Sequence, residues 1–253
     1  MRKMIVPLLA ALFLLACNNN KKSEPGSKEV ANDDTTKTTT ATAAVTDSTP
    51  FEKLLGSYVG AFGDNKITLL ITRADKDSVA GRSIVGGNDR PFTGTLTEKE
   101  AGTFVVTAKE PGDDPNDGAF NFTINTANAD LVTGSWTPND AKKKAKEYSL
   151  QRKKFEYKAD VGSYPQASMR LLKPKDVENE MKEDLEFMRN EIFARHGFCF
   201  KKKYLRQQFE NEAWYVPNTV DIKGFLTDIE KKNIEMIKRY ERYADEYGDE
   251  YGR

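Results

Sequence analysis

Seven short segments with the character of β-strands follow one another between residues 51 and 153, and no segment of helical periodicity interrupts them. They are rich in β-branched and aromatic residues, and clusters of Gly, Pro, Asp and Asn separate them at nearly even spacing. Such a series favours antiparallel pairing of each strand with the next, because parallel neighbours need long crossover connections. The segments are 67–72, 78–85, 91–96, 103–108, 119–125, 131–136 and 147–151. We therefore predict an antiparallel β-domain over residues 51–153, as a small barrel or a strongly curved sheet.

The opening segment Leu55-Gly56-Ser57-Tyr58-Val59-Gly60 resembles the Gly-x-aromatic start of lipocalin-like barrels, and the resemblance covers only these residues. It implies a barrel that carries a small apolar ligand. With strands this short, we favour a barrel filled by its own side chains instead.

The acidic loop 113–118 invites comparison with a calcium-binding EF-hand loop. However, Pro115 stands where the third ligand should be, and Ile124 stands where the bidentate glutamate belongs. We interpret the loop as a wide hairpin turn. One histidine and two cysteines exclude a Cys/His zinc cluster, so we predict no metal site and no cofactor.

From Asp184 the apolar pattern takes the period of a helix, with Leu185, Met188 and Ile192 on one face. Gly197 can take a positive φ and is expected to end this helix, while Arg195 lies in its last turn, where a cation suits the helix dipole.

A second helix is expected to start at the capping box formed by Thr227 and Glu230. We therefore predict an α+β chain, in which a basic linker at 154–167 joins the β-domain to a small, mainly helical domain at 168–243. An acidic tail at 244–253 is expected to be frayed.

The helical region carries a family resemblance. The segment Met188-Arg189-Asn190-Glu191-Ile192-Phe193-Ala194-Arg195-His196-Gly197-Phe198 is similar to the signature of the YARHG domain. The similarity continues through Phe209, Trp214-Tyr215-x-Pro217 and Leu226-Thr227-x-x-Glu230-x-x-Asn233-Ile234, although Phe193 stands where the family's name has Tyr. The resemblance implies a small helical, extracellular module of bacterial envelope proteins with no established molecular activity.

Residues 1–16 resemble the signal peptide of a bacterial lipoprotein. Arg2 and Lys3 precede an uncharged, mostly apolar run, which is too short to span a bilayer as a helix. This run ends in Leu14-Leu15-Ala16-Cys17, which resembles a lipobox in which Cys17 receives the lipid. We expect a lipid-anchored protein of the cell envelope. An ordinary secretory signal with an incidental cysteine is the alternative.

Residues 18–50 contain no aromatic residue, no Leu and no Ile, so they bury too little apolar surface to offset the entropy of ordering. We expect a flexible, Thr-rich tether at 17–50. Asp34, Asp47 and Asp77 each begin a triplet that resembles the O-glycosylation acceptor of Bacteroidota, which suggests that origin.

Charge and residue counts limit the functions that the chain can have. Lys plus Arg equals Asp plus Glu at 39 each, which argues against a nucleic-acid partner. His196 is the only histidine, and Cys199 is separated from it by the helix-ending Gly197 and flanked by aromatic residues. We therefore expect no Cys/His catalysis and predict that the protein is not an enzyme.

Seven residues form the candidate site, as a binding surface or a structural network. Asn190, Glu191, Arg195 and His196 are expected to hold the helix terminus in place, and the alternative is an anion or peptide-carboxylate site at Arg195.

The remaining three candidates lie further along the chain. Trp214 and Tyr215 are expected to be core or lid aromatics, rather than a platform for glycans. Asn233 lies in an apolar stripe, so its amide should pair with the backbone or with the network of Asn190 and Arg195. A binding module for a cell-wall, glycan or protein partner is the favoured function, and an apolar-ligand carrier is the alternative. The sequence does not indicate which oligomeric state the protein has.

Overall fold

The computed structural model describes residues 49–247. The predicted signal peptide, the lipidation site at Cys17, nearly all of the tether and residues 248–253 of the predicted tail lie outside the described residues. Within the described part of the chain, no helix has the length and apolar character needed to cross a membrane.

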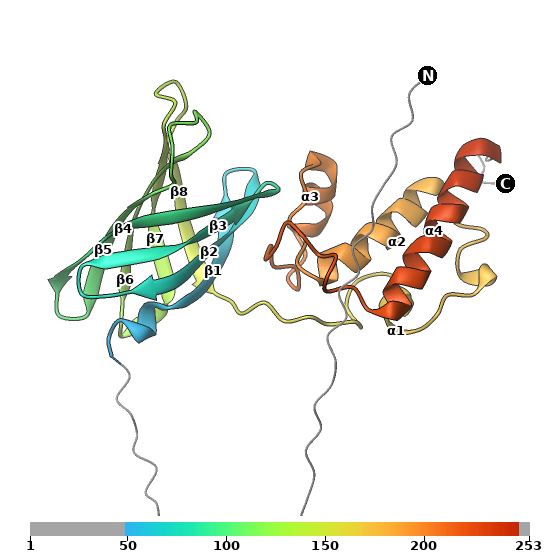
Figure 1. Cartoon of the computed structure of the whole chain (residues 1–253), viewed down its shortest axis with the longest axis horizontal. Helices are drawn as coiled ribbons and strands as arrows, with labels where there is room; N and C mark the ends of the chain where they lie inside the picture. Colours follow the sequence, from blue (N-terminus) through green and yellow to red (C-terminus); the bar gives the residue numbers. More distant parts are fainter. Residues whose placement is uncertain (1–48, 248–253) are drawn as a thin grey trace, which may run out of the picture. The chain divides into compact units, whose positions relative to one another are not determined.

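Eight antiparallel strands form a closed barrel, in which each strand pairs with the next and β1 pairs with β8 (Figure 1). A 3-10 turn, η1 (Glu52–Leu54), precedes it. The strands are β1 (Gly56–Phe62), β2 (Asn65–Ala74), β3 (Ser78–Val85), β4 (Asn88–Glu100), β5 (Thr103–Lys109), β6 (Gly118–Asn125), β7 (Asn128–Pro138) and β8 (Lys146–Arg152). The predicted order of an antiparallel β-domain followed by helices is confirmed, and each of the seven predicted segments lies within one strand, from β2 to β8.

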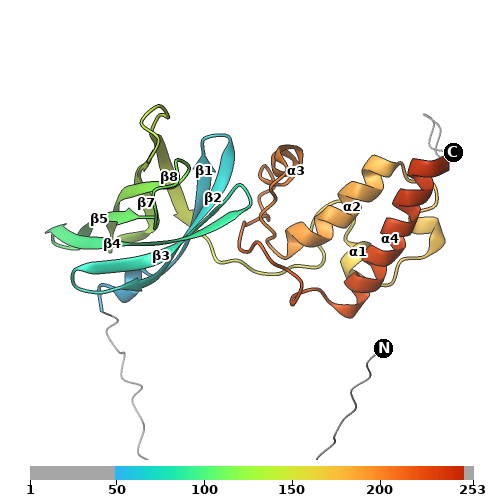
Figure 2. The same ribbon diagram turned by 45° about the horizontal axis from the view of Figure 1, so that its top comes forward.

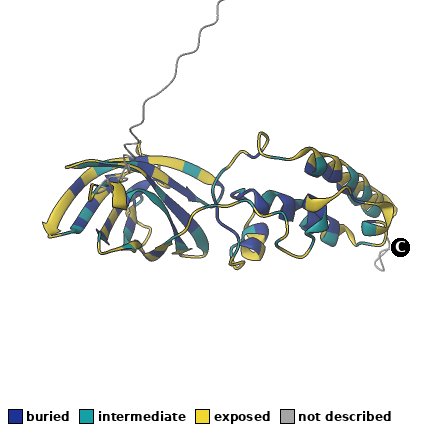
Figure 3. Ribbon diagram, turned by 90° about the horizontal axis from the view of Figure 1, so that it is seen from below, coloured by how far each residue is buried: buried dark blue, intermediate teal, exposed yellow. Residues whose placement is uncertain are grey.

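The alternation of side chains along each strand fills the barrel. In β6, Phe120, Phe122 and Ile124 are buried while Asn121 and Thr123 between them are exposed, as expected for a sheet with one face inside and one face in solvent. The same alternation runs around the barrel in Figure 3, where buried and exposed positions follow one another along the strands. The apolar interior is therefore supplied by the strands themselves.

One end of the barrel is closed by η1 and by an arginine of β8. Leu54 of η1 is buried in the apolar interior. Arg152 donates hydrogen bonds to the carbonyls of Leu55 and Ala129 and to the hydroxyl of Tyr58, at 2.5 to 3.1 Å. Its guanidinium also lies 4.8 Å from the centre of the Tyr58 ring. The turns after β1, β3, β5 and β7 meet at the opposite end, which we call the mouth of the barrel.

The helical domain contains two longer helices that pack against each other (Figure 2). Its elements are α1 (Gln166–Met169), η2 (Pro174–Asp176), α2 (Lys182–Arg195), α3 (Lys203–Phe209) and α4 (Asp228–Tyr247). Leu185, Met188 and Ile192 of α2 pack with Ile234 and Ile237 of α4, so the predicted apolar face is the core face. The positive φ of Gly197, 70°, follows α2 as predicted.

Two features of the helical region differ from the prediction. Helix α3 was not predicted, because a helix of seven residues offers too few turns for a helical period to show in the sequence. The tail predicted at 244–253 begins too early, since α4 continues to Tyr247 and Asp245 on its last turns pairs with Lys182 of α2.

Besides the apolar core between α2 and α4, the helical domain has an aromatic cluster around Phe209 of α3. Its ring stacks on those of Phe187 and Phe200, with centroids 5.2 and 5.1 Å apart. The buried Cys199 lies beside this cluster and accepts a hydrogen bond from the backbone N–H of Gly87, at 3.0 Å. Burial raises the pKa of its thiol to about 11, so Cys199 stays protonated at neutral pH.

Candidate functional site

The last turn of α2 carries a buried ion pair. Glu191 and Arg195 lie four residues apart on one face of the helix, with Oε2 of the carboxylate 2.5 Å from Nη2 of the guanidinium. Arg195 also donates from Nε to the carbonyl of Val161 at 2.9 Å and from Nη1 to the hydroxyl of Ser168 at 3.0 Å. Burial lowers the pKa of Arg195, and the charge of Glu191 opposes this effect. The side chain has no exposed surface, so an anion could reach it only if the domain opened.

Glu191 binds a backbone segment as well as an arginine. Its two carboxylate oxygens accept hydrogen bonds from the N–H groups of Ser163 and Tyr164, at 2.7 and 2.8 Å. Gly162 has a φ of 91°, and a Cβ atom there would lie 2.3 Å from the Glu191 carboxylate. Residues from 162 onward are thus part of the helical domain, although the sequence had assigned 154–167 to a linker.

His196 joins the end of α2 to the start of α4. Its Nε2 lies 2.8 Å from Oε2 of Glu230, and its ring stacks on that of Tyr157 at 4.5 Å between centroids. The side chain of His196 thus binds a residue 34 positions further along the chain, rather than a neighbour in its own helix turn. Glu230 also completes the predicted capping box, in which its carboxylate accepts from the N–H of Thr227 and its own N–H donates to the Thr227 hydroxyl.

Glu230 and Arg195 belong to one network because both bind Ser168. The hydroxyl of Ser168 donates to Oε1 of Glu230 at 2.7 Å and accepts from Arg195. Burial alone would raise the pKa of Glu230, but hydrogen bonds from His196, Thr227 and Ser168 outweigh it and lower the pKa. These donors favour the ionised carboxylate. Hydrogen bonds within the domain therefore stabilise the buried charged side chains of this network.

Asn233 lies apart from this network and binds the backbone. Its Oδ1 accepts from the N–H of Leu172 at 2.9 Å, and its Nδ2 donates to the carbonyls of Ala167 and Arg170 at 2.8 and 2.7 Å. The sequence predicted that this amide pairs either with the backbone or with the network of Asn190 and Arg195. In the structure it pairs with the backbone.

The other candidate residues also lie outside the network. Asn190 donates to the carbonyl of Glu186, one turn earlier in α2. Tyr215 is buried and donates to the carbonyl of Phe198, whereas Trp214 is half-buried and packs its edge against the Phe209 ring at 6.3 Å. Both aromatic residues thus pack with the Phe209 cluster. Since Arg195 is inaccessible, no cleft joins Arg195, His196 and Trp214.

The network offers no catalytic arrangement among the described residues. Ser168 uses its hydroxyl proton for Glu230, and the ring of His196 is held against the same carboxylate. The thiol of Cys199 is buried and protonated. Residues 49–247 also contain no group of three or more His, Cys, Asp and Glu side chains placed to hold a metal ion.

A small aromatic pocket opens next to the network. It has a volume of about 230 Å³ and is lined by Phe155, Tyr157, His196, Asn218, Phe225 and Thr227. Phe225 is 62% exposed. Of the lining residues, the sequence had indicated only His196 as a site residue, because Phe155, Tyr157 and Phe225 lie outside any periodic segment.

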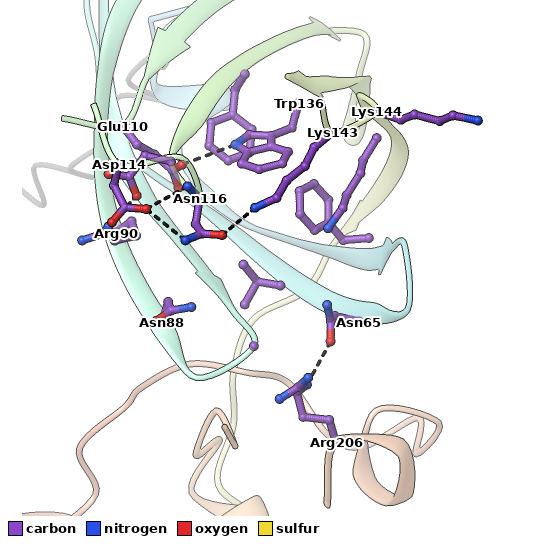
Figure 4. Close-up of a pocket in the computed structure, with 16 residues that line it drawn as sticks. Asn65, Asn88, Arg90, Glu110, Asp114, Asn116, Trp136, Lys143, Lys144 and Arg206 are labelled. Atoms are coloured by element: carbon purple, nitrogen blue, oxygen red, sulfur yellow. Dashed lines mark hydrogen bonds and ion pairs between the residues drawn. The ribbon is translucent and has the colours of Figure 1, made fainter. Parts of the chain in front are cut away.

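A larger cavity opens at the mouth of the barrel (Figure 4). It has a volume of about 580 Å³, within the range of small-molecule sites. The strands and the turns after β3, β5 and β7 supply its walls, together with Arg206 of α3, which donates to Oδ1 of Asn65 at 2.9 Å. The polar lining residues are Asn65, Asn88, Arg90, Glu110, Asp114, Asn116, Asp117, Lys143, Lys144, Lys146 and Arg206. The sequence did not indicate this site.

Comparison with protein families finds the YARHG domain at residues 162–242. This confirms the resemblance and includes residues 162–167 in the domain. No curated protein and no solved structure gives a significant match. The lipoprotein assignment, the Bacteroidota origin and the lipocalin resemblance stay predictions.

Proposed function

We propose that this chain, whose residues 162–242 form a YARHG domain, is a non-catalytic, lipid-anchored protein of the bacterial cell envelope that binds cell-wall glycan. YARHG domains are extracellular, envelope-associated modules, which supports the location. The lipid anchor rests on the lipobox-like segment ending at Cys17. The binding role rests on one observation, the aromatic pocket beside His196.

The composition of the pocket suits a sugar ring. The rings of Phe155, Tyr157 and Phe225 offer apolar faces, against which the C–H face of a saccharide can stack. Asn218 and Thr227 place an amide and a hydroxyl at the same pocket, where they can bond sugar hydroxyls. A site with apolar walls and a few placed polar groups is the usual form of a small-molecule pocket.

The buried network prepares this pocket for binding. The Tyr157 hydroxyl donates to Glu230 at 3.1 Å while its ring stacks on His196, so two walls of the pocket are fixed before a ligand arrives. A preformed site loses less conformational entropy on binding. The signature residues of the domain then support the binding surface, and Phe225 contributes its exposed face.

Sedimentation with insoluble peptidoglycan tests this proposal. The full chain in detergent should pellet with the wall material, and Phe225→Ala should weaken binding about tenfold, since it removes one stacking face. Tyr243→Ala is the matched control, because Tyr243 of α4 is 61% exposed but lies outside the pocket. Wild-type protein that stays in the supernatant would refute glycan binding, as would equal loss in both variants.

Metabolic labelling with palmitate tests the anchor separately. Label should enter the wild-type chain and be absent from Cys17→Ser. Label in both proteins, or in neither, would contradict lipidation at Cys17 and leave the glycan proposal standing.

A further inference from the structure

Most residues that line the cavity at the barrel mouth are polar or charged, eleven of the sixteen, although aromatic residues also line it. Phe62 is 3% exposed and Phe120 is 1% exposed, because these rings pack into the barrel interior. A carrier of apolar ligands needs open apolar walls, since burial of apolar surface is the main source of its affinity. The polar lining therefore favours a polar ligand over an apolar one.

The carboxylates of the cavity are already occupied by the protein. Glu110 accepts hydrogen bonds from the Ser83 hydroxyl at 2.6 Å, the N–H of Gly118 at 2.9 Å and the indole of Trp136 at 3.3 Å. Burial raises the pKa of Glu110, and these donors oppose the effect. Asp117 pairs with Arg90 at 2.5 Å.

The third acid of the cavity is bound within its own turn. Oδ1 of Asp114 accepts from the N–H and the side-chain amide of Asn116, at 2.8 and 3.0 Å. Against these three acids the lining carries five basic residues, which are Arg90, Lys143, Lys144, Lys146 and Arg206, so it has an excess of positive charge.

Two lysines supply this free positive charge. Within residues 49–247, neither Lys143 nor Lys146 has a carboxylate at ion-pair distance, and the side chain of Lys143 points into the cavity toward Asn116 (Figure 4). The ammonium of Lys146 lies 4.6 Å from the centre of the Phe62 ring and 5.5 Å from that of Trp136. Cation–π contacts thus hold one charge in place over the cavity floor. Burial lowers the pKa of Lys146, and an anion beside it would relieve that cost.

The walls of the cavity are fastened to one another. Lys143, in the turn after β7, donates to Oδ1 of Asn116 at 2.7 Å (Figure 4). In addition, Asn139 donates to the carbonyl of Asp114 at 3.1 Å. The turns after β5 and β7 are therefore joined, and the cavity is formed before any ligand enters. Its amide side chains, Asn65, Asn88 and Asn116, suit ligand hydroxyls.

We propose that the barrel mouth is a binding site for a small hydroxylated organic anion, a sugar acid or a sugar phosphate, whose anionic group lies against Lys143 and Lys146. The carboxylate and the phosphate are the two forms that the same ammonium groups accept. This site lies in the barrel and is independent of the aromatic pocket of the YARHG domain.

Titration followed by tryptophan fluorescence tests the proposal. The Trp214→Phe chain leaves Trp136 as the reporter, because the indole of Trp136 lines the cavity near Lys146. Glucuronate and glucose 6-phosphate are the anionic probes, and glucose is the neutral probe of matched size. At least one anion should bind about tenfold more tightly than glucose, and added salt should weaken it.

Variants assign the binding to the lysines. Lys146→Gln should weaken binding of the anion about tenfold, and Lys143→Gln should weaken it to a similar degree if Lys146→Gln impairs folding. Lys76→Gln is the control, since Lys76 is exposed in the turn between β2 and β3, outside the cavity. Equal affinity for glucose and both anions, no binding of either anion, or unchanged binding in both cavity variants would overturn the site. Phe225→Ala should leave it intact, which separates this proposal from glycan binding.

Discussion

The barrel and the helical domain stabilise their interiors by different means. The barrel interior is mainly apolar, although the barrel buries four polar or charged residues, Thr68, Ser83, Glu110 and Asp117, and its backbone hydrogen bonds are made between neighbouring strands. The helical domain buries seven polar or charged residues, which are Ser168, Asn190, Glu191, Arg195, His196, Glu230 and Asn233. The difference follows from the connections. Short turns join the strands, whereas long irregular segments join the helices and need other partners for their backbone groups.

The signature residues of the helical domain supply those partners. Glu191 accepts from the N–H groups at 163 and 164, Arg195 donates to the carbonyl of Val161, and Asn233 binds backbone groups at 167, 170 and 172. These side chains form hydrogen bonds with backbone groups that, in the barrel, are bonded to a neighbouring strand. The comparison teaches that the signature maintains the fold, and that the proposed glycan-binding pocket lies beside it.

Loss of Arg195 should give the largest effect. Arg195→Met should cost the helical domain about 3–5 kcal/mol, because it leaves Glu191 buried without its cation. Denaturation in a Trp136→Phe background, where Trp214 reports the helical domain, measures this cost. A cost below about 1 kcal/mol would contradict the structural role of the pair. The double variant Glu191→Gln, Arg195→Met should recover part of the loss, because the uncompensated charge is gone.

Loss of the Glu230 charge should give a smaller, pH-dependent effect. The pKa of Glu230 is lowered in the folded chain, so its ionised form stabilises the fold above the ordinary carboxyl range, and this stability is lost as the pH falls through the folded pKa. Glu230→Gln should cost about 1.5–3 kcal/mol at neutral pH. The difference from wild type should shrink in acid. Thermal melting of both chains across the acid range measures it, and a constant difference would show that the charge is not responsible.

Asn233→Leu should destabilise the helical domain by about 1–3 kcal/mol, because the N–H of Leu172 and two carbonyls lose their partner in a buried place. Lys232→Leu, at an exposed neighbouring position of α4, is the control and should change little. Denaturation followed through Trp214 compares the two. Equal melting of Asn233→Leu and wild type would mean that the backbone segment finds other partners.

The same contrast explains what the sequence could predict. The strands and the capping box of Thr227 and Glu230 were predictable, because alternation and capping are local patterns. Barrel closure was not, since β1 and β8 meet through the pairs Tyr58 with Arg152 and Val59 with Gln151, far apart in the chain.

Of the seven candidate residues, the structure brings Glu191, Arg195 and His196 into one network, and their partners in it were not predictable. The backbone groups that Asn233 binds belong to every residue type and leave no trace in the sequence. The aromatic pocket and the barrel-mouth cavity depend on turns and loops that meet only in the folded chain.

Two tyrosines inside the barrel give the smallest and sharpest test. The hydroxyl of Tyr58 donates to the carbonyl of Leu54 at 3.0 Å and accepts from Arg152 at 2.5 Å, whereas the buried hydroxyl of Tyr148 has no partner among the described residues. Tyr58→Phe should therefore cost about 1 kcal/mol, and Tyr148→Phe should be neutral or slightly stabilising. Denaturation in a Trp214→Phe background, where Trp136 reports the barrel, measures both. If Tyr148→Phe cost as much as Tyr58→Phe, polar groups would matter inside the barrel as they do in the helical domain, and the contrast between the two regions would fail.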